Sequence, residues 1–71
     1  MNKSSSNFKI ASNVKRLRQE KGISQDRLSK KADLSINTIV NVELGTNPNP
    51  TIDTLLKISN ALGVGVDDLI K

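Results

Sequence analysis

The sequence predicts an all-α fold, a compact bundle of five short helices in a chain of 71 residues. Apolar residues recur at intervals of three and four positions, the period of an α-helix, and no segment alternates apolar and polar residues as a half-buried strand does. Ser or Thr stands at the start of several of these segments and Gly at the end of several, as is typical of helix termini. A chain of this length forms one domain with a modest core.

The first helix is expected over residues 9–21. Three aliphatic residues recur there at four and three positions and share one face: Ile10, Val14 and Leu17. Gly22 follows as a helix stop. Residues 1–8 are rich in Ser and Asn, so we expect a flexible arm before a domain that spans residues 9–71.

Two short helices are expected next, over residues 24–32 and 35–44. Ser24 and Ser35 stand at their starts, where a hydroxyl accepts hydrogen bonds from backbone N–H groups that lack partners. Each helix has a small apolar face, formed by Leu28, Ala32, Ile39 and Val42. Leu34 lies at the join and can fill the angle between the helices. Helices this short need other segments to pack on.

Two further helices are expected over residues 51–62 and 66–70. Thr51 is a helix-start residue, and Gly63 ends the first of the two. That helix has a wide apolar face, which we expect at the centre of the core: Ile52, Leu55, Leu56, Ile58 and Leu62. Two prolines within residues 46–50 exclude regular structure from the preceding loop.

The composition excludes several classes of function. The chain has neither Cys nor His, so it lacks thiol and imidazole groups for catalysis and for a zinc site. Asp67 and Asp68 are adjacent carboxylates, but they lie at a predicted helix start, which they stabilise. We therefore predict no catalytic residue, metal, cofactor or small-molecule ligand. Polar N-terminal residues and the lack of a long apolar run predict a cytoplasmic protein without membrane association.

Charge is distributed unevenly along the chain, whose net charge is +4. Residues 1–42 contain nine Lys and Arg residues and three acidic residues, a net charge of +6. Residues 43–71 contain two Lys residues and four acidic residues, a net charge of −2. Such polarity suits a polyanion at the basic part of the chain. Phe8 is the single aromatic residue, which argues against recognition by base stacking.

The segment from Ser24 to Gly45 resembles the helix-turn-helix of the Cro/C1-type (XRE-like) family of phage repressors and small bacterial transcriptional regulators. The matching residues are Gln25, Leu28, Ser29, Ala32, Leu34, Ser35, Ile39, Val42, Glu43 and Gly45. Two positions depart from the family pattern: Asp33 stands where Gly is usual in the turn, and Ser29 where Ala is frequent. The resemblance extends over most of the chain and implies a lambda-repressor-like DNA-binding domain.

In such a domain the second helix of the motif, the reading helix, lies in the major groove and the first crosses the DNA backbone. With the apolar face turned to the core, the residues left for base contacts are Ser35, Ile36, Asn37, Val40 and Asn41. Asn pairs with adenine, and an aliphatic side chain contacts the methyl group of thymine, so we expect an A·T-leaning half-site. Alternatively, Asn37 supports only the helix start, and Ile36 and Val40 cover a protein contact.

Phosphate contacts are expected around the motif, from Gln25, Lys21, Lys30, Thr46 and Asn47. The resemblance implies that Gln25 uses both its side chain and the unpaired backbone N–H groups at its helix start. Lys21 and Lys30 add positive charge. Thr46 and Asn47 follow the reading helix, where relatives use loop amides, but this loop has no Lys or Arg.

The resemblance also implies a structural ion pair between Arg18 and Glu43, which locks the first helix to the end of the reading helix. It implies a two-fold homodimer as well, because two modules gain affinity by engaging half-sites about one helical turn, ~34 Å, apart. Candidates for the dimer surface are Leu44, Val66, Leu69 and Ile70, although the last three could instead close the core.

The predicted function is therefore a sequence-specific transcriptional regulator of double-stranded DNA, acting as a repressor. The alternative is a protein-interaction module, such as an antitoxin or an antagonist-bound regulator, that uses the same fold. Salt-dependent affinity for duplex DNA separates the two.

Overall fold

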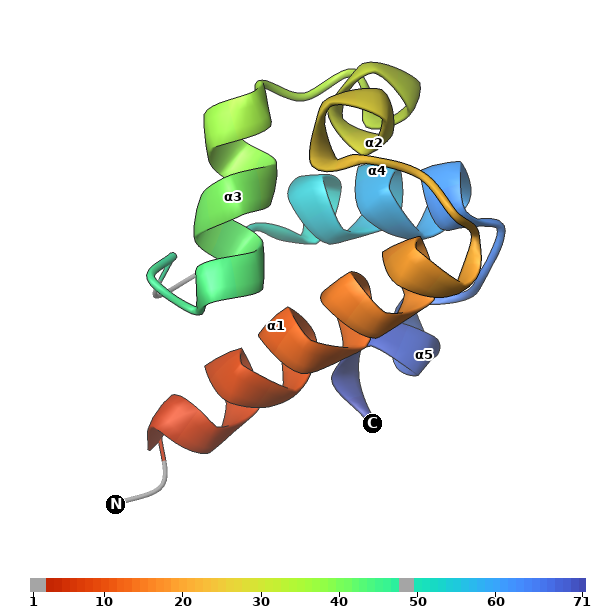
Figure 1. Ribbon diagram of the computed structural model, residues 1–71. Coiled ribbons are helices and arrows are strands. Elements are labelled where there is room, and N and C mark those ends of the chain that lie inside the picture. Colours follow the sequence, from red (N-terminus) through yellow and green to blue (C-terminus); the bar gives the residue numbers. More distant parts are fainter. Residues whose placement is uncertain (1–2, 48–49) are drawn as a thin grey trace.

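The computed structural model describes residues 3–47 and 50–71, with side chains described from Lys9 onward. Five α-helices and no strand occur in these residues: α1 (Lys3–Glu20), α2 (Gln25–Ala32), α3 (Ile36–Leu44), α4 (Ile52–Leu62) and α5 (Val66–Ile70). The long α1 packs against α3, α4 and α5, while α2 packs against α3 and α4 (Figure 1). The predicted all-α bundle is confirmed.

Side-chain caps start three of the helices. The hydroxyl oxygens of Ser24, Ser35 and Thr51 accept hydrogen bonds from the backbone N–H three residues later, at 3.0, 3.2 and 3.0 Å. Each cap satisfies a donor that the first turn of a helix leaves unpaired. The helices expected from Ser24, Ser35 and Thr51 thus begin one residue later, with the expected residue as the cap.

The start of α1 differs from the prediction. α1 begins at Lys3, so the flexible arm that we expected over residues 1–8 is wrong for residues 3–8, which continue the helix. Residues 1 and 2 lie outside the described part of the chain, as do Pro48 and Asn49 of the proline-containing loop. Ser and Asn cost a helix less than about 0.7 kcal/mol each. Because extending a formed helix needs no new nucleus, such residues do not mark its start in the sequence.

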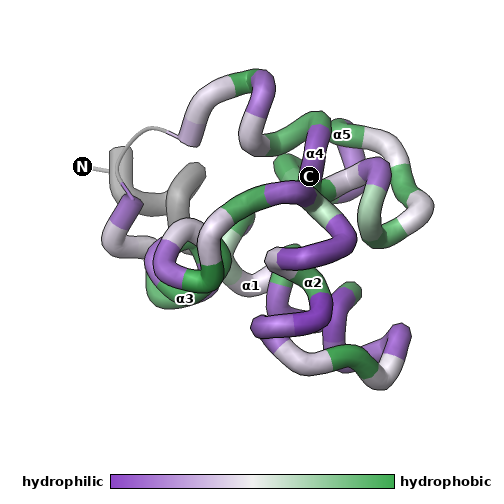
Figure 2. The backbone as a smooth tube through the Cα atoms, turned by 90° about the horizontal axis from the view of Figure 1, so that it is seen from above, coloured by the Kyte–Doolittle hydropathy of each residue, from purple (hydrophilic) through white to green (hydrophobic). Residues whose placement is uncertain are grey.

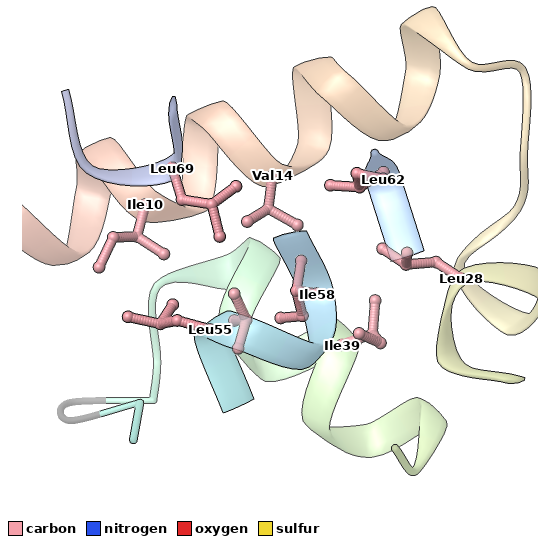
Figure 3. Close-up of a cluster of buried hydrophobic side chains, with 9 residues drawn as sticks. Ile10, Val14, Leu28, Ile39, Leu55, Ile58, Leu62 and Leu69 are labelled. Atoms are coloured by element: carbon pink, nitrogen blue, oxygen red, sulfur yellow. The ribbon is translucent and has the colours of Figure 1, made fainter. Parts of the chain in front are cut away.

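The core is an aliphatic cluster to which all five helices contribute (Figure 3). Its buried members are Ile10, Val14, Leu28, Ile39, Val42, Leu55, Ile58, Leu62 and Leu69. Figure 2 shows hydrophobic residues recurring between hydrophilic ones along the helices, the pattern that leaves one side of each helix for the core. Each fully buried aliphatic side chain contributes about 1.5–3 kcal/mol relative to its exposed state.

The apolar face of α4 is narrower than predicted. Ile52 and Leu56 are 67% and 45% exposed, so their assignment to the centre of the core is wrong. The buried stripe instead includes Ser59, whose hydroxyl donates to the carbonyl oxygen of Leu56 at 3.0 Å and thereby satisfies its only donor. The two larger aliphatic side chains remain on the outside of the helix.

The short α5 closes the bundle through Leu69, which is fully buried. The side-chain amide of Asn13 on α1 donates to the Leu69 carbonyl at 2.9 Å and fixes α5 against α1. At the other end of α5, the carboxylate of Asp68 accepts from the backbone N–H of Gly65 at 3.2 Å. This hydrogen bond, with a smaller contribution from Lys71, holds the pKa of Asp68 below its ordinary value.

Candidate nucleic-acid interface

The join between α2 and α3 is a tight turn. Asp33 adopts the left-handed conformation, with φ 57° and ψ 46°, and ends α2. The backbone N–H of Leu34 donates to the Ser29 carbonyl at 2.9 Å, which closes the last turn of α2 as a left-handed helix cap does. Leu34 itself is half-buried and packs against the core. These contacts fix the angle at which α3 leaves α2.

The outward side of α3 carries the residues that were predicted for base contacts. With Ile39 and Val42 buried in the core, the opposite side is open. We call the residues there the reading face: Ser35, Ile36, Asn37, Val40 and Asn41. All of them are exposed except Val40, which is half-buried. The face offers amides, aliphatic groups and one hydroxyl, and it bears no charge.

Two members of the reading face also have partners within the protein. The Ser35 hydroxyl accepts from the Thr38 backbone N–H and lies 2.9 Å from the Thr38 hydroxyl, so its first role is to cap α3. The Asn41 side-chain oxygen lies 3.3 Å from the Thr46 hydroxyl. Among the described residues both hydrogen bonds between Asn41 and the Thr46 hydroxyl use oxygens of Asn41, so its amide N–H₂ group stays available as a donor.

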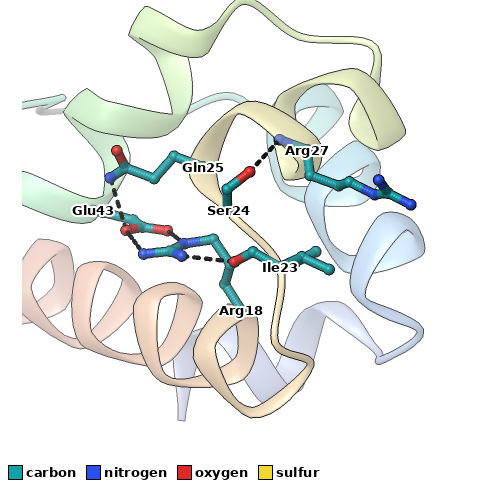
Figure 4. A network of polar contacts seen from close by, with 6 residues as sticks. All are labelled: Arg18, Ile23, Ser24, Gln25, Arg27 and Glu43. Atoms are coloured by element: carbon teal, nitrogen blue, oxygen red, sulfur yellow. Dashed lines mark hydrogen bonds and ion pairs between the residues drawn. The ribbon is translucent and has the colours of Figure 1, made fainter.

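A partly buried polar network holds the reading helix in place (Figure 4). Arg18 of α1 donates to Glu43 of α3 through Nε at 2.6 Å and through a terminal nitrogen at 3.0 Å. The other terminal nitrogen of Arg18 donates to the Ile23 carbonyl at 2.8 Å. Glu43 also accepts from Gln25 of α2 at 3.0 Å. One carboxylate therefore joins three helices, α1, α2 and α3.

The energetics of this network follow from its enclosure. The side chains of Arg18 and Glu43 are only 12% and 3% exposed. The hydrogen bond to Glu43 raises the pKa of Arg18 above its ordinary value, against the opposing effect of burial. Both terminal nitrogens and Nε of Arg18 have acceptors, which is the condition under which a desolvated ion pair is tolerated. The two residues form the ion pair that the resemblance implies.

Gln25 occupies a different role from the one predicted for its side chain. One of its amide hydrogens is directed at Glu43, inside the protein. A primary amide has two N–H donors, so one remains for a phosphate. The backbone N–H groups of the first turn of α2 also lack intrahelical acceptors. The donors left for a phosphate at this helix start are therefore backbone N–H groups and the second side-chain N–H of Gln25.

The two lysines predicted for phosphate contacts are not equivalent. Lys30 is exposed and pairs with Asp26 at 3.1 Å, which offsets part of its charge. Lys21 lines a cavity of about 330 Å³ together with Lys31, Ile23 and the C-terminal residues of α4. No residue of α3 lines this cavity. Lys21 therefore lies beside the C-terminal end of α4 and not beside the reading face.

The loop after α3 offers fewer donors than expected. The backbone N–H groups of Thr46 and Asn47 both donate to the Asn41 carbonyl, at 3.0 and 3.3 Å. The Thr46 hydroxyl also lies 3.3 Å from that carbonyl. The expectation that these loop amides are open for phosphate is wrong, because the end of α3 uses them as its own cap.

Arg27 is a cation at the motif that sequence reasoning missed. It is exposed in the first turn of α2, and its backbone N–H binds the Ser24 cap. Its guanidinium points away from the Arg18–Glu43 pair (Figure 4) and takes part in no ion pair among the described side chains. Its position two residues after Gln25, at a helix start, was the signal that could have identified it.

Four large aliphatic side chains are exposed outside the reading face. They are Leu44 of α3, Ile52 and Leu56 of α4, and Ile70 of α5. Leu44 is 63% and Ile70 51% exposed, while Val66 is half-buried. Leu69 has no exposed surface, so its assignment to a dimer surface is wrong. A five-residue helix has too few residues for its sequence to show which of two neighbouring aliphatic side chains faces inward.

Over residues 3–47 and 50–71, no group of three or more acidic side chains is placed to hold a metal ion. Within the same ranges, no helix has the length and apolar character needed to cross a membrane.

Comparison with known proteins agrees with this geometry. A family model described as helix-turn-helix matches residues 14–69. An uncharacterized HTH-type transcriptional regulator of Sinorhizobium fredii, y4dJ, is 36% identical over 61 residues, which are 86% of this chain and 78% of that protein. SinR of Bacillus subtilis, an HTH-type transcriptional regulator, is 34% identical over 61 residues. The match covers 86% of this chain but only 55% of SinR.

A solved structure is similar over nearly the whole fold. The restriction-modification controller protein C.AhdI of Aeromonas hydrophila superposes with a TM-score of 0.86 and 28% sequence identity. The superposition covers 92% of this chain and 97% of C.AhdI. The helix-turn-helix therefore lies in the same architecture in both proteins.

Proposed function

Because the chain belongs to the Cro/C1-type helix-turn-helix family of transcriptional regulators, we propose that it is a sequence-specific repressor that binds double-stranded DNA as a two-fold dimer. The observation that carries this proposal is the reading face. Its five residues stand together on the outward side of α3, and the Arg18–Glu43 pair holds that helix in place. In this architecture such a face lies in the major groove.

Asn37 and Asn41 are the residues that we propose for discrimination between bases. A primary amide can at once donate to N7 of adenine and accept from its N6 amino group. This pair of hydrogen bonds distinguishes adenine from the other bases. The two side chains are one helical turn apart on the same side of α3, so they can reach neighbouring base pairs. A good pair of this kind contributes roughly 1–3 kcal/mol of discrimination.

Sequence-independent affinity comes from the positive part of the chain. Arg27 and the start of α2 are the phosphate contacts that the geometry favours most, followed by Lys30. An operator on a bacterial or phage genome places this activity in the cytoplasm. We propose repression and not activation because a protein that only occupies an operator needs no contact beyond its DNA-binding surface.

The proposed dimer uses the exposed aliphatic residues Leu44, Ile52, Leu56 and Ile70. A two-fold interface brings the same patch of both subunits together, and an aliphatic patch is complementary to itself. The segment from Glu43 onward has a net charge of −2, whereas the preceding part is strongly positive. Two copies therefore approach with the least repulsion through the later helices.

The test is selection of duplexes from an A·T-biased random pool, followed by fluorescence-anisotropy titration at two salt concentrations. We expect a palindrome to be enriched and its affinity to fall steeply with salt, because phosphate contacts release counterions. Asn37→Ala should lower operator affinity roughly 5- to 150-fold, the equivalent of about 1–3 kcal/mol, and leave affinity for random duplex unchanged. Asn60→Ala, an exposed Asn on α4, is the matched control and should change neither affinity.

The second candidate is a protein-interaction module. It is favoured by one observation, the aliphatic line that Ile36, Val40 and Leu44 form at four-residue intervals on α3. If no duplex binds at either salt concentration, the repressor proposal is wrong, and this line becomes the surface on which a protein partner is sought.

A further inference from the structure

The reading helix lacks the side chains that most often read bases. Of the nine residues of α3, only Glu43 is charged, and its carboxylate is bound to Arg18 and Gln25. No Arg or Lys of α3 is therefore available to pair with guanine, the commonest specific contact of DNA-binding proteins. What α3 exposes instead is a line of amides beside a line of aliphatic side chains.

The aliphatic line begins where base contacts are made. Ile36 is the first residue of α3, directly after the Ser35 cap, and it is 42% exposed. Val40 lies one turn later on the same side and is half-buried. In a helix-turn-helix the N-terminal residues of the reading helix contact the base edges. Ile36 and Val40 thus face the groove floor, while Leu44 stands at the far end of the helix.

The major groove offers few apolar groups to such side chains. In unmodified DNA the apolar group on a base edge is the C5 methyl of thymine. Cytosine carries hydrogen at the same ring position, and methylation at C5 gives 5-methylcytosine the methyl group of thymine in the same place. An aliphatic side chain that packs on this methyl therefore distinguishes methylated from unmethylated pyrimidines, whichever base bears the group.

We propose that Ile36 and Val40 form a methyl-reading site, which takes the C5-methyl edge of thymine or 5-methylcytosine and makes DNA binding sensitive to cytosine C5 methylation. This inference rests on the proposed function, since it specifies the bases that the same face reads. The charge of the surroundings favours DNA over a protein as the occupant of this face. The chain carries +4 overall, and the neighbouring α2 exposes Arg27, which forms no ion pair among the described side chains.

The experiment removes one methyl group at a time. The selected operator is remade with deoxyuridine in place of each thymidine in turn, and binding of the parent and of Ile36→Ala is measured by fluorescence anisotropy. Deoxyuridine keeps every hydrogen-bonding group of thymidine. At the contacted positions we expect about a fourfold loss of affinity for the parent, the factor that corresponds to about 0.8 kcal/mol for one buried methyl group. Ile36→Ala should lose this difference at the positions that Ile36 contacts and keep it where Val40 makes the contact.

The second arm adds the methyl group to another base. At the same positions a C·G pair replaces T·A, with cytosine either unmodified or methylated at C5. The parent should bind the methylated duplex about fourfold more tightly than the unmethylated one, and Ile36→Ala should not distinguish them at the positions that Ile36 contacts. Asn60→Ala, the exposed control on α4, should keep the parent's methyl preference.

The outcomes separate the two proposals. If the unmodified operator binds but no deoxyuridine position weakens binding, methyl reading is overturned and the DNA-binding function stands. If Ile36→Ala keeps the full sensitivity to deoxyuridine, the assignment to Ile36 is overturned. If no duplex binds, the proposed function itself fails. Circular dichroism of Ile36→Ala establishes that the variant is folded, as its exposed position leads us to expect.

Discussion

The two helices of the motif, α2 and α3, are alike at their ends and differ on their exposed sides. Each starts with a Ser hydroxyl that accepts from the backbone N–H three residues later, and each ends at a residue with positive φ, Asp33 or Gly45. In Figure 2, α2 is coloured mostly as hydrophilic, whereas hydrophobic and hydrophilic residues alternate along α3. The caps at these ends fix where each of the two helices starts and stops.

The difference on the exposed sides suggests a division of labour. α2 exposes four charged residues, Asp26, Arg27, Lys30 and Lys31, while α3 exposes none. The three cations among them attract DNA of any sequence, and uncharged amides and methyl groups distinguish one base from another. Placing the two kinds of group on different helices lets affinity and selectivity vary separately, by substitution of one helix at a time.

The largest expected effect comes from the contact that joins the two helices. Glu43→Leu leaves the guanidinium of Arg18 buried without its carboxylate, so the free energy of unfolding should fall by about 3–5 kcal/mol. Urea denaturation followed by circular dichroism measures this loss. The matched control is Glu20→Leu, which removes the carboxylate of an exposed pair with Arg16 at 3.2 Å and should change stability by no more than about 0.5 kcal/mol.

A double variant separates a stranded charge from lost packing. Arg18→Met combined with Glu43→Leu removes both charges and keeps similar volumes, so it should regain most of the stability that Glu43→Leu loses. If Glu43→Leu is no worse than Glu20→Leu, the network does not hold the two helices together, and the common anchor of α2 and α3 lies elsewhere.

This network also marks the limit of what the sequence can predict. Arg18 and Glu43 are 25 positions apart, and their opposite charges alone do not indicate that they meet. Their pairing was expected only through the family resemblance, and the hydrogen bond from Gln25 was not expected at all. The starts of α2, α3 and α4 were predictable because a cap such as Ser24 acts within three residues of sequence. The start of α1 was not.

Burial was predictable only where a single face stood out. In α1, α2 and α3 the helical period predicted most of the buried aliphatic residues correctly. It missed Ala11, which is buried, and it included Leu17, which is only half-buried. In α4 the pattern marks five aliphatic residues, but the neighbouring helices cover only part of that arc and leave Ile52 and Leu56 outside. Which part is covered depends on how the helices cross, and that is set by the whole bundle.

A smaller effect is expected from one cation of α2. If α2 supplies affinity without selectivity, Arg27→Ala should weaken binding to operator and random duplex by the same factor. The slope of log affinity against log salt should become shallower by about one. Lys57→Ala, which removes a lysine paired with Asp53 on α4, should leave the slope unchanged. A change in the ratio of operator to random affinity in Arg27→Ala would contradict the division between the two helices.

The smallest effect concerns the ends that α2 and α3 share. Asp33 holds φ 57° and Gly45 holds φ 76°. Glycine adopts this conformation without steric cost, whereas a residue with Cβ is strained there. Asp33→Gly should therefore raise the free energy of unfolding by about 0.5–1 kcal/mol, helped by loss of a negative charge at a helix C-terminus, and Gly45→Ala should lower it by about 1 kcal/mol.

Urea denaturation measures both changes, and Asp33→Asn separates charge from conformation, since Asn also tolerates positive φ. If Asp33→Asn gains as much stability as Asp33→Gly, the charge explains the effect. The backbone at Asp33 is then no more strained than the backbone at Gly45. If Asp33→Gly loses stability, the Asp33 side chain stabilises the turn in its own right. In that case the ends of α2 and α3 differ as their exposed sides do, and the turn that sets the angle of the reading helix depends on the side chain of Asp33.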